Sequence, residues 1–315
     1  MAAVFTSPMS ALADAYRSRV VDATTSLFSH ADYPLADTMS YRGDPGLFGP
    51  DSMTWPVIGD VTAFVGGLRA LLVQAAHPEV AAGVADHSRY RTDPLGRLSR
   101  TSSWVTATSF GAMAEVEAAV AVVRGAHRPV RGRSHRDRPY SASHPEMAAW
   151  VHNALTDSFL AAYRHYGPRR LTEGDADRFV AEQTKVGALL DAAPLPTTAA
   201  DLSSWIVDHP DLARSPGQAE AIRFLRNPPL PLAVRAGYAG LFAAAVATLP
   251  TELRRLLGLV DVPGAEFAGR AMVSFLRWSL GSSPTWHLAL TRVGAEIPDG
   301  LFHRSLLDSE SLVAD

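Results

Sequence analysis

The chain has 315 residues, of which 47% are hydrophobic and 19% are charged, and its formal net charge is −3. This composition excludes a disordered chain, and the mixture of 29 basic and 32 acidic residues argues against a nucleic-acid-binding protein. The sequence contains no cysteine, which excludes disulfides, thiolate nucleophiles and iron–sulfur clusters.

Two features bear on localisation. The longest apolar stretches, around residues 61–76 and 237–249, are interrupted by Arg69 or too short to span a bilayer. The N-terminus lacks the basic region and apolar core of a secretion signal. We therefore expect a cytoplasmic protein with no integral membrane segment.

Hydrophobic residues recur at helical spacing through most of the chain. We expect helices over residues 11–30, 57–74, 78–88, 95–110, 113–130, 172–190, 198–208, 217–226, 232–247, 252–257 and 265–281. Another helix should follow Ser143, which has a glutamate three residues later, and Thr172 should cap the next one together with Asp175. Residues 33–56 and 131–143 are expected to be irregular. Strand patterns are few, so the sequence predicts an all-α protein with a single multi-helix domain.

His127 is the first candidate for a functional residue. It shares one helical face with four valines, Val116, Val120, Val123 and Val130. Pro129 removes the helical N–H that would bond to the Gly125 carbonyl, so that carbonyl is available to orient an imidazole. Position alone favours a core histidine bonded to the backbone over a metal ligand, and both interpretations stay open.

A second candidate group lies on the helix expected at 95–110. Arg97, Arg100 and Thr101 share one face of it, and Trp104 extends that face. Two guanidiniums beside a tryptophan need carboxylate or phosphate partners if the face is buried. The alternative is a solvated arginine face with the tryptophan partly covered.

Three further residues are weaker candidates. His77 precedes a proline at a helix junction and has Glu79 nearby, and His152 follows a tryptophan on a predicted helix. The sequence has no HExxH, no paired ExxH, no GxSxG and no GxGxxG motif, which argues against zincins, di-iron bundles, serine hydrolases and Rossmann dehydrogenases. A series of helices with one inward histidine and no other cofactor motif is compatible with a haem pocket and equally with a plain helical binding protein.

Several segments in this order resemble the MpaB-type oxygenase family, to which the rubber oxygenases (latex-clearing proteins) belong. They are GLFGPDSMTWPV, GGLRALLVQAAHPEVAAGVADHSRYRTDPLGRLSRTSSWV, VVRGAHRPVRG and WVHNALTDSFLAAY, and the resemblance covers roughly residues 40–280. It implies an all-helical fold with a globin-like core around haem b. The expected organisation is an N-terminal helical extension (1–36), the haem domain (37–290) and a C-terminal tail (291–315).

The resemblance also implies roles for residues. His127 corresponds to the axial haem ligand, and Arg97 and Thr101 correspond to the distal arginine and threonine. Arg100 stands where latex-clearing protein has a lysine, and arginine does not readily deprotonate. Glu79 is the nearest candidate for the family's proposed glutamate base. Trp104 and His152 are expected beside the cofactor, and His77 at the rim of the catalytic cavity.

We therefore expect a haem b-dependent oxygenase that acts on a small hydrophobic or electron-rich metabolite with dioxygen. Two alternatives stay open. The same pocket could run a peroxidase or peroxygenase cycle with peroxide, or the bundle could bind a lipid or isoprenoid without chemistry. A homodimer is possible.

Overall fold

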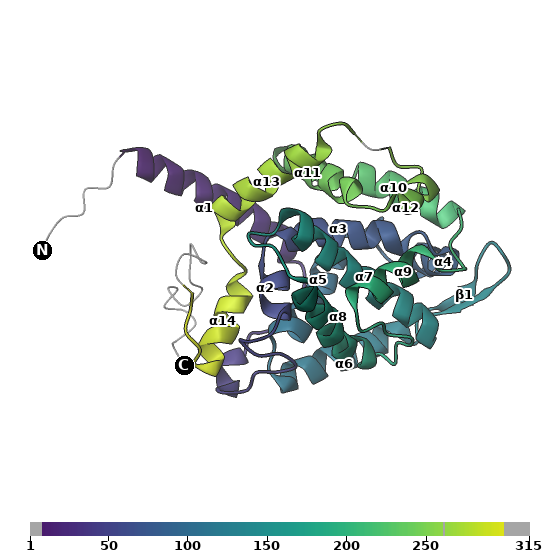
Figure 1. The fold of residues 1–315 in the computed structure, drawn as a ribbon, viewed down its shortest axis with the longest axis horizontal. Coiled ribbons are helices and arrows are strands. Elements are labelled where there is room, and N and C mark those ends of the chain that lie inside the picture. Colours follow the sequence, from purple (N-terminus) through teal and green to yellow (C-terminus); the bar gives the residue numbers. More distant parts are fainter. Residues whose placement is uncertain (1–7, 261, 299–315) are drawn as a thin grey trace, which may run out of the picture.

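The computed structural model describes residues 8–260 and 262–298 (Figure 1). These residues form fourteen α-helices and one two-stranded antiparallel hairpin, and 66% of them are helical. The prediction of an all-α single domain is confirmed. Within the described ranges, no helix combines the length and the apolarity needed to cross a membrane.

The helices are, in chain order, α1 (Pro8–Phe28), α2 (Thr54–Gly59), α3 (Thr62–Gln74), α4 (Pro78–His87), α5 (Pro94–Phe110), α6 (Met113–His127), α7 (Pro145–Tyr166), α8 (Glu173–Ala188), α9 (Ala199–Val207), α10 (Pro216–Arg226), α11 (Leu232–Ala247), α12 (Thr251–Leu256), α13 (Ala265–Leu280) and α14 (Pro284–Val293). A 3-10 turn, η1, spans Thr38–Tyr41. Strands β1 (Arg131–Arg133) and β2 (Pro139–Ser141) pair with Gly132 opposite Tyr140.

Most predicted helices are confirmed to within a few residues, and Leu232–Ala247 agrees at both ends. The capping box at the start of α8 is also confirmed, since Thr172 Oγ1 accepts from the Asp175 amide at 3.1 Å. The predicted N-cap at Ser143 is wrong. Helix α7 begins at Pro145, whose fixed φ suits the first helical position, and its N-cap is His144.

Three other differences have physical causes. The helix expected at 57–74 is divided into α2 and α3 at Asp60, which has extended backbone and accepts from the Thr62 amide at 2.9 Å. The loop expected at 131–143 contains the β1–β2 hairpin. Helix α14 was not expected; buried Arg292 holds it by donating to the Asp44 carbonyl at 2.8 Å and to Thr38 Oγ1 at 2.6 Å.

The expected domain boundaries stay predictions. Helix α1 projects from the body in Figure 1 and packs against α13 and α5. Its Tyr16 meets the ring of Phe275 edge-on, and Arg17 lies over Trp278 with its guanidinium carbon 4.5 Å from the ring centroid. Most of the expected tail, 299–315, lies outside the described residues.

The core is built on the pairing of α3 with α7 near the centre of the molecule (Figure 1). Gly66 of α3 allows the close approach, because a Cβ at that position would lie 2.6 Å from Cδ1 of Phe159 and 3.0 Å from its Cα. Arg69 is buried in the same helix and donates to Asp157 Oδ2 at 2.6 Å and to Ser158 Oγ at 2.8 Å. Helix α7 is thereby fixed in register against α3.

We expect Gly66→Ala to destabilise the protein by about 1–3 kcal/mol, because the added methyl group collides with α7. The adjacent Gly67 has no atom within 4 Å of an added Cβ. Gly67→Ala should therefore stabilise α3 by about 0.5–1 kcal/mol through helix propensity. Chemical denaturation of both variants measures the difference, and equal effects would contradict the close contact.

Candidate functional site

Helix α5 carries the predicted arginine cluster and begins at a well-defined cap. Asp93 accepts from the Gly96 amide at 2.9 Å, and Pro94 occupies the first turn. A Cβ on Gly96 would lie 2.2 Å from the Asp93 carboxylate, so a side chain at Gly96 would disturb the cap. Asp93 also accepts from exposed Arg100 at 3.1 Å. Arg100 therefore forms an ion pair at the surface.

Arg97 has a different environment from Arg100. It is half-buried, and its guanidinium carbon lies 5.8 Å from the ring centroid of Tyr90. Burial, with the nearby charge of Arg100, lowers the pKa of Arg97. No carboxylate among the described residues lies within ion-pair distance of it. Exposed Thr101 donates to the Arg97 carbonyl at 3.0 Å. Arg97 is thus a cation able to receive an anionic group.

His127 is the last residue of α6, a helix that packs mainly against α5. It is half-buried, as are Val120 and Val123 on the same face, while Val116 is fully buried. The expected burial in the core is thus only partial. Burial lowers the pKa of His127, and no described residue is hydrogen-bonded to its ring. The predicted bond to a backbone carbonyl is absent from the described part of the chain.

A small cavity lies between α5, α7 and α8. Its volume, about 20 Å³, is enough for roughly one water molecule. Trp104 and His152 line it, but His127 does not. The full lining is Ile58, Trp104, Val105, Thr108, Ser109, His152, Leu155, Phe159, Gln183 and Val186.

His77 and Glu79 lie away from this cavity, at the start of α4. Buried Glu79 accepts from Ser134 Oγ at 2.7 Å and from Arg136 Nε at 3.1 Å, which ties the hairpin to α4. Burial favours the neutral carboxyl, but these hydrogen bonds outweigh it and hold the pKa of Glu79 below its usual value. Burial, with neighbouring His209, lowers the pKa of His77 to about 4.

His209 and Asp211 were missed by sequence reasoning. Together with His77 they form a group whose ligand atoms all lie within 4.8 Å of one another. A signal was present, because His-Pro-acid occurs three times in the sequence, at 77–79, 144–146 and 209–211. Nothing in the spacing, however, says that the first and third of these meet in space.

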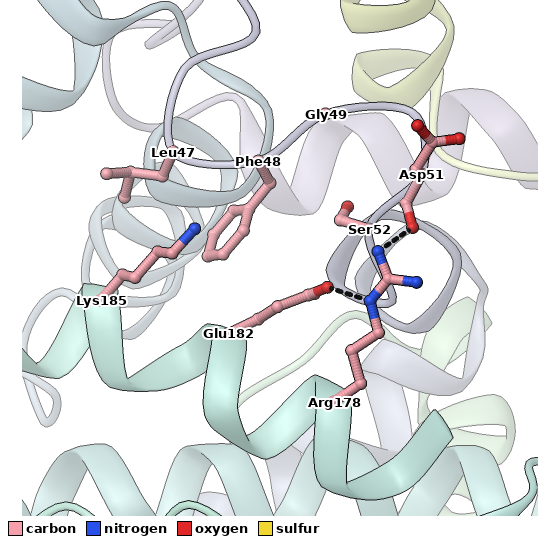
Figure 2. Close-up of a pocket in the computed structure, with 8 residues that line it drawn as sticks. All are labelled: Leu47, Phe48, Gly49, Asp51, Ser52, Arg178, Glu182 and Lys185. Carbon is pink, nitrogen blue, oxygen red and sulfur yellow. Dashed lines mark hydrogen bonds and ion pairs between the residues drawn. The ribbon is translucent and has the colours of Figure 1, made fainter. Parts of the chain in front are cut away.

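A larger cleft, of about 190 Å³, lies between α8 and the segment before α2 (Figure 2). Glu182 accepts there from the Met53 amide at 3.0 Å and the Thr54 amide at 2.8 Å, and Arg178 donates to Glu182 at 3.1 Å. These groups hold the start of α2. No predicted site residue lines this cleft, which is formed by Leu47, Phe48, Gly49, Asp51, Ser52, Arg178, Glu182 and Lys185.

The chemistry of His127 and Arg97 fits a haem, but the size of the cavity does not. A neutral imidazole without a hydrogen-bond partner and a guanidinium without a carboxylate are the groups that an iron porphyrin with propionates requires. The cavity beside α5 is far too small for a macrocycle. A haem could therefore bind in one of two ways. Side chains of α5, α7 and α8 would have to move apart, or the haem would have to lie against the half-exposed face of α6.

The environment of His152 predicts how stability depends on pH. Burial lowers its pKa to about 4. Between pH 6.5 and 4 the unfolded chain therefore binds a proton that the folded chain refuses, so stability falls as the pH is lowered, by at most about 3 kcal/mol for this residue. Denaturation from pH 7 to 4.5 should show a shallower fall for His152→Gln than for the wild type. Equal slopes would contradict this prediction.

Comparison with protein-family models gives a match. Residues 55–278, more than two thirds of the chain, match the family described as ER-bound oxygenase mpaB/B'/Rubber oxygenase, catalytic domain. No curated protein and no solved structure matches the chain. The match includes α5, α6 and α7 and supports an oxygenase, and so an oxidoreductase. The chain belongs to the mpaB/rubber oxygenase catalytic-domain family.

Proposed function

We propose that this protein is a haem b-dependent oxygenase that acts on a small hydrophobic or electron-rich molecule. The observation that carries the proposal is the His127 ring at the end of α6, which has a lowered pKa and no hydrogen-bond partner among the described residues. Membership of an oxygenase family gives this ring a chemical context.

His127 would hold the iron. A ligating imidazole must be unprotonated, and burial favours that form by lowering the pKa of the ring. The half-buried valines on the same face, Val120 and Val123, would provide an apolar wall for a porphyrin. Haem b, when bound, supplies the iron at which dioxygen is activated.

Arg97 would bind an anionic group, either the haem propionates or negative charge on the face of the haem where dioxygen would bind. Its guanidinium is half-buried and has no carboxylate partner among the described residues, so no existing ion pair needs to be broken. Thr101 could supply a hydroxyl if its bond to the Arg97 carbonyl is released. Arg100 would contribute less directly because Asp93 already pairs with it.

The substrate would lie against the apolar lining between α5, α7 and α8 once side chains of these helices move apart, because the cavity there holds only about one water molecule. Trp104, Val105, Leu155, Phe159 and Val186 offer carbon surface there and would exclude water from the reaction. His152 lines the same cavity and, with its pKa lowered to about 4, would stay neutral at pH 7.

His77 and Glu79 have no place in this oxygenase site. Both are buried at the start of α4, and Glu79 is occupied by Ser134 and Arg136. Neither residue lines the cavity beside α5. We therefore do not assign the role of base to Glu79.

The first test is spectroscopic. Protein produced with sufficient haem, or titrated with hemin, should show a Soret band, and His127→Ala should lose it or shift it strongly. His135→Ala is the matched control, because His135 is exposed in the hairpin that follows α6. A colourless wild type that takes up no hemin would refute the proposal. Turnover with dioxygen plus reductant, compared with turnover with peroxide, separates oxygenase from peroxidase chemistry.

The second test separates the two arginines. Arg97→Gln should weaken hemin binding about tenfold or more, because a charge-assisted hydrogen bond contributes about 1.5–3 kcal/mol. Arg100→Gln should change it less than about twofold, since exposed ion pairs contribute little. Soret titrations give both dissociation constants. A larger effect from Arg100→Gln would reverse the assignment.

A further inference from the structure

A second group of chemically active side chains lies at the end of the molecule where α4, the turn after α9 and the β1–β2 hairpin meet (Figure 1). His77 is the N-cap of α4, and His209 and Asp211 lie in the turn after α9. One ligand atom from each of the three lies within 4.8 Å of the others. Two imidazoles and a carboxylate are a common ligand set for divalent transition metals.

His77 lacks a partner in this group. Its side chain is 6% exposed, and its Nδ1 is buried and forms no hydrogen bond with any described residue. Glu79 Oε2 is 3.4 Å from Nδ1, but the ring is not oriented to bond to it. A bound metal would give the buried Nδ1 atom of His77 a partner in either of two ways. Nδ1 could be the ligand itself, or it could turn to Glu79 while the other nitrogen ligates, as metal-binding histidines commonly do.

The histidines are held in place by aromatic rings. The His209 ring is 4.9 Å from Trp150 and 4.8 Å from Trp205, measured between centroids, and His77 is 5.7 Å from Trp150. His209 and Asp211 are half-buried, which leaves the cluster open to solvent on one side.

The charges around the cluster allow a cation. The negative charges near the two histidines are those of Glu79, Asp211 and Glu146. Two of them are balanced, Glu79 by Arg136 and Asp211 by Arg138. Arg136 is already bonded to Glu79. Arg138 pairs with Asp211 but is exposed, so releasing it costs little. Asp211 also lies 4.0 Å from Arg136, so a metal would compete with the ion pairs that Asp211 forms with Arg138 and with Arg136.

We propose that His77, His209 and Asp211 bind one divalent metal ion of the zinc type, with water in the remaining coordination position. This site is separate from the proposed haem site and would join the start of α4 to the turn after α9. Metal binding at a site formed only in the folded chain would stabilise the fold.

Zinc titration of the full-length protein tests this proposal. After removal of metals with EDTA and then of the chelator, calorimetry with ZnCl₂ should show one equivalent bound by the wild type. His209→Gln and Asp211→Asn should bind at least tenfold more weakly. His135→Gln, an exposed hairpin histidine, and His127→Ala, the haem variant, should each keep the site. Retention in His127→Ala distinguishes this site from the haem proposal, which the Soret band tests.

One further measurement controls for misfolding, and a second tests the competition between zinc and Arg138. Zinc should raise the Tm of the wild type and of His135→Gln but not of His209→Gln or Asp211→Asn, whose folding circular dichroism would verify. Arg138→Gln should bind zinc several-fold more tightly than the wild type, because Asp211 loses the nearer of its two competing partners. A purely structural cluster predicts no stoichiometric zinc binding, or equal binding in all variants, and either result would overturn the proposal.

Discussion

The fold depends on satisfying one buried cation. Arg69 lies in the middle of apolar α3, where an unpaired guanidinium would cost several kcal/mol. The guanidinium donates to Asp157 and Ser158 of α7. It also donates to the carbonyl of Thr248, the residue after α11, at 3.4 Å. Three segments far apart in the sequence must therefore meet in one register. This requirement fixes α7 and thereby the cavity face on which His152 lies.

Local patterns predicted the elements whose ends are determined locally. The capping box at Thr172 and the uninterrupted run of α11 are examples. The division between α2 and α3 could not be predicted in this way, because Asp60 is held by Arg277, 217 residues away, at 2.8 Å. Helix α14 was missed for the same reason, since Arg292 anchors it to the N-terminal segment. Long-range ion pairs and hydrogen bonds decide these places.

In the candidate site, too, local spacing predicted some features, and contacts between distant residues decided the others. Helical spacing placed Arg97 and Thr101 on one face of α5 correctly. It could not show that Arg100 pairs with Asp93 while Arg97 has no carboxylate partner among the described residues. The apolar stripe identified the inner face of α6 without showing how little covers His127. The neighbours of His77 come from a turn much later in the chain, so no spacing rule could have joined them.

Lys185 is the single lysine of the sequence, and it lies at the edge of the cleft in Figure 2, with Nζ 5.7 Å from the centroid of the Phe48 ring. An amine-directed acylating dye applied at a pH that favours lysine can therefore modify one side chain, with the N-terminal amine as the other reactive amine and no thiol in competition. The molecule thus carries a natural attachment point for a fluorophore on α8. Such a probe would report on displacement of that helix without any engineered residue.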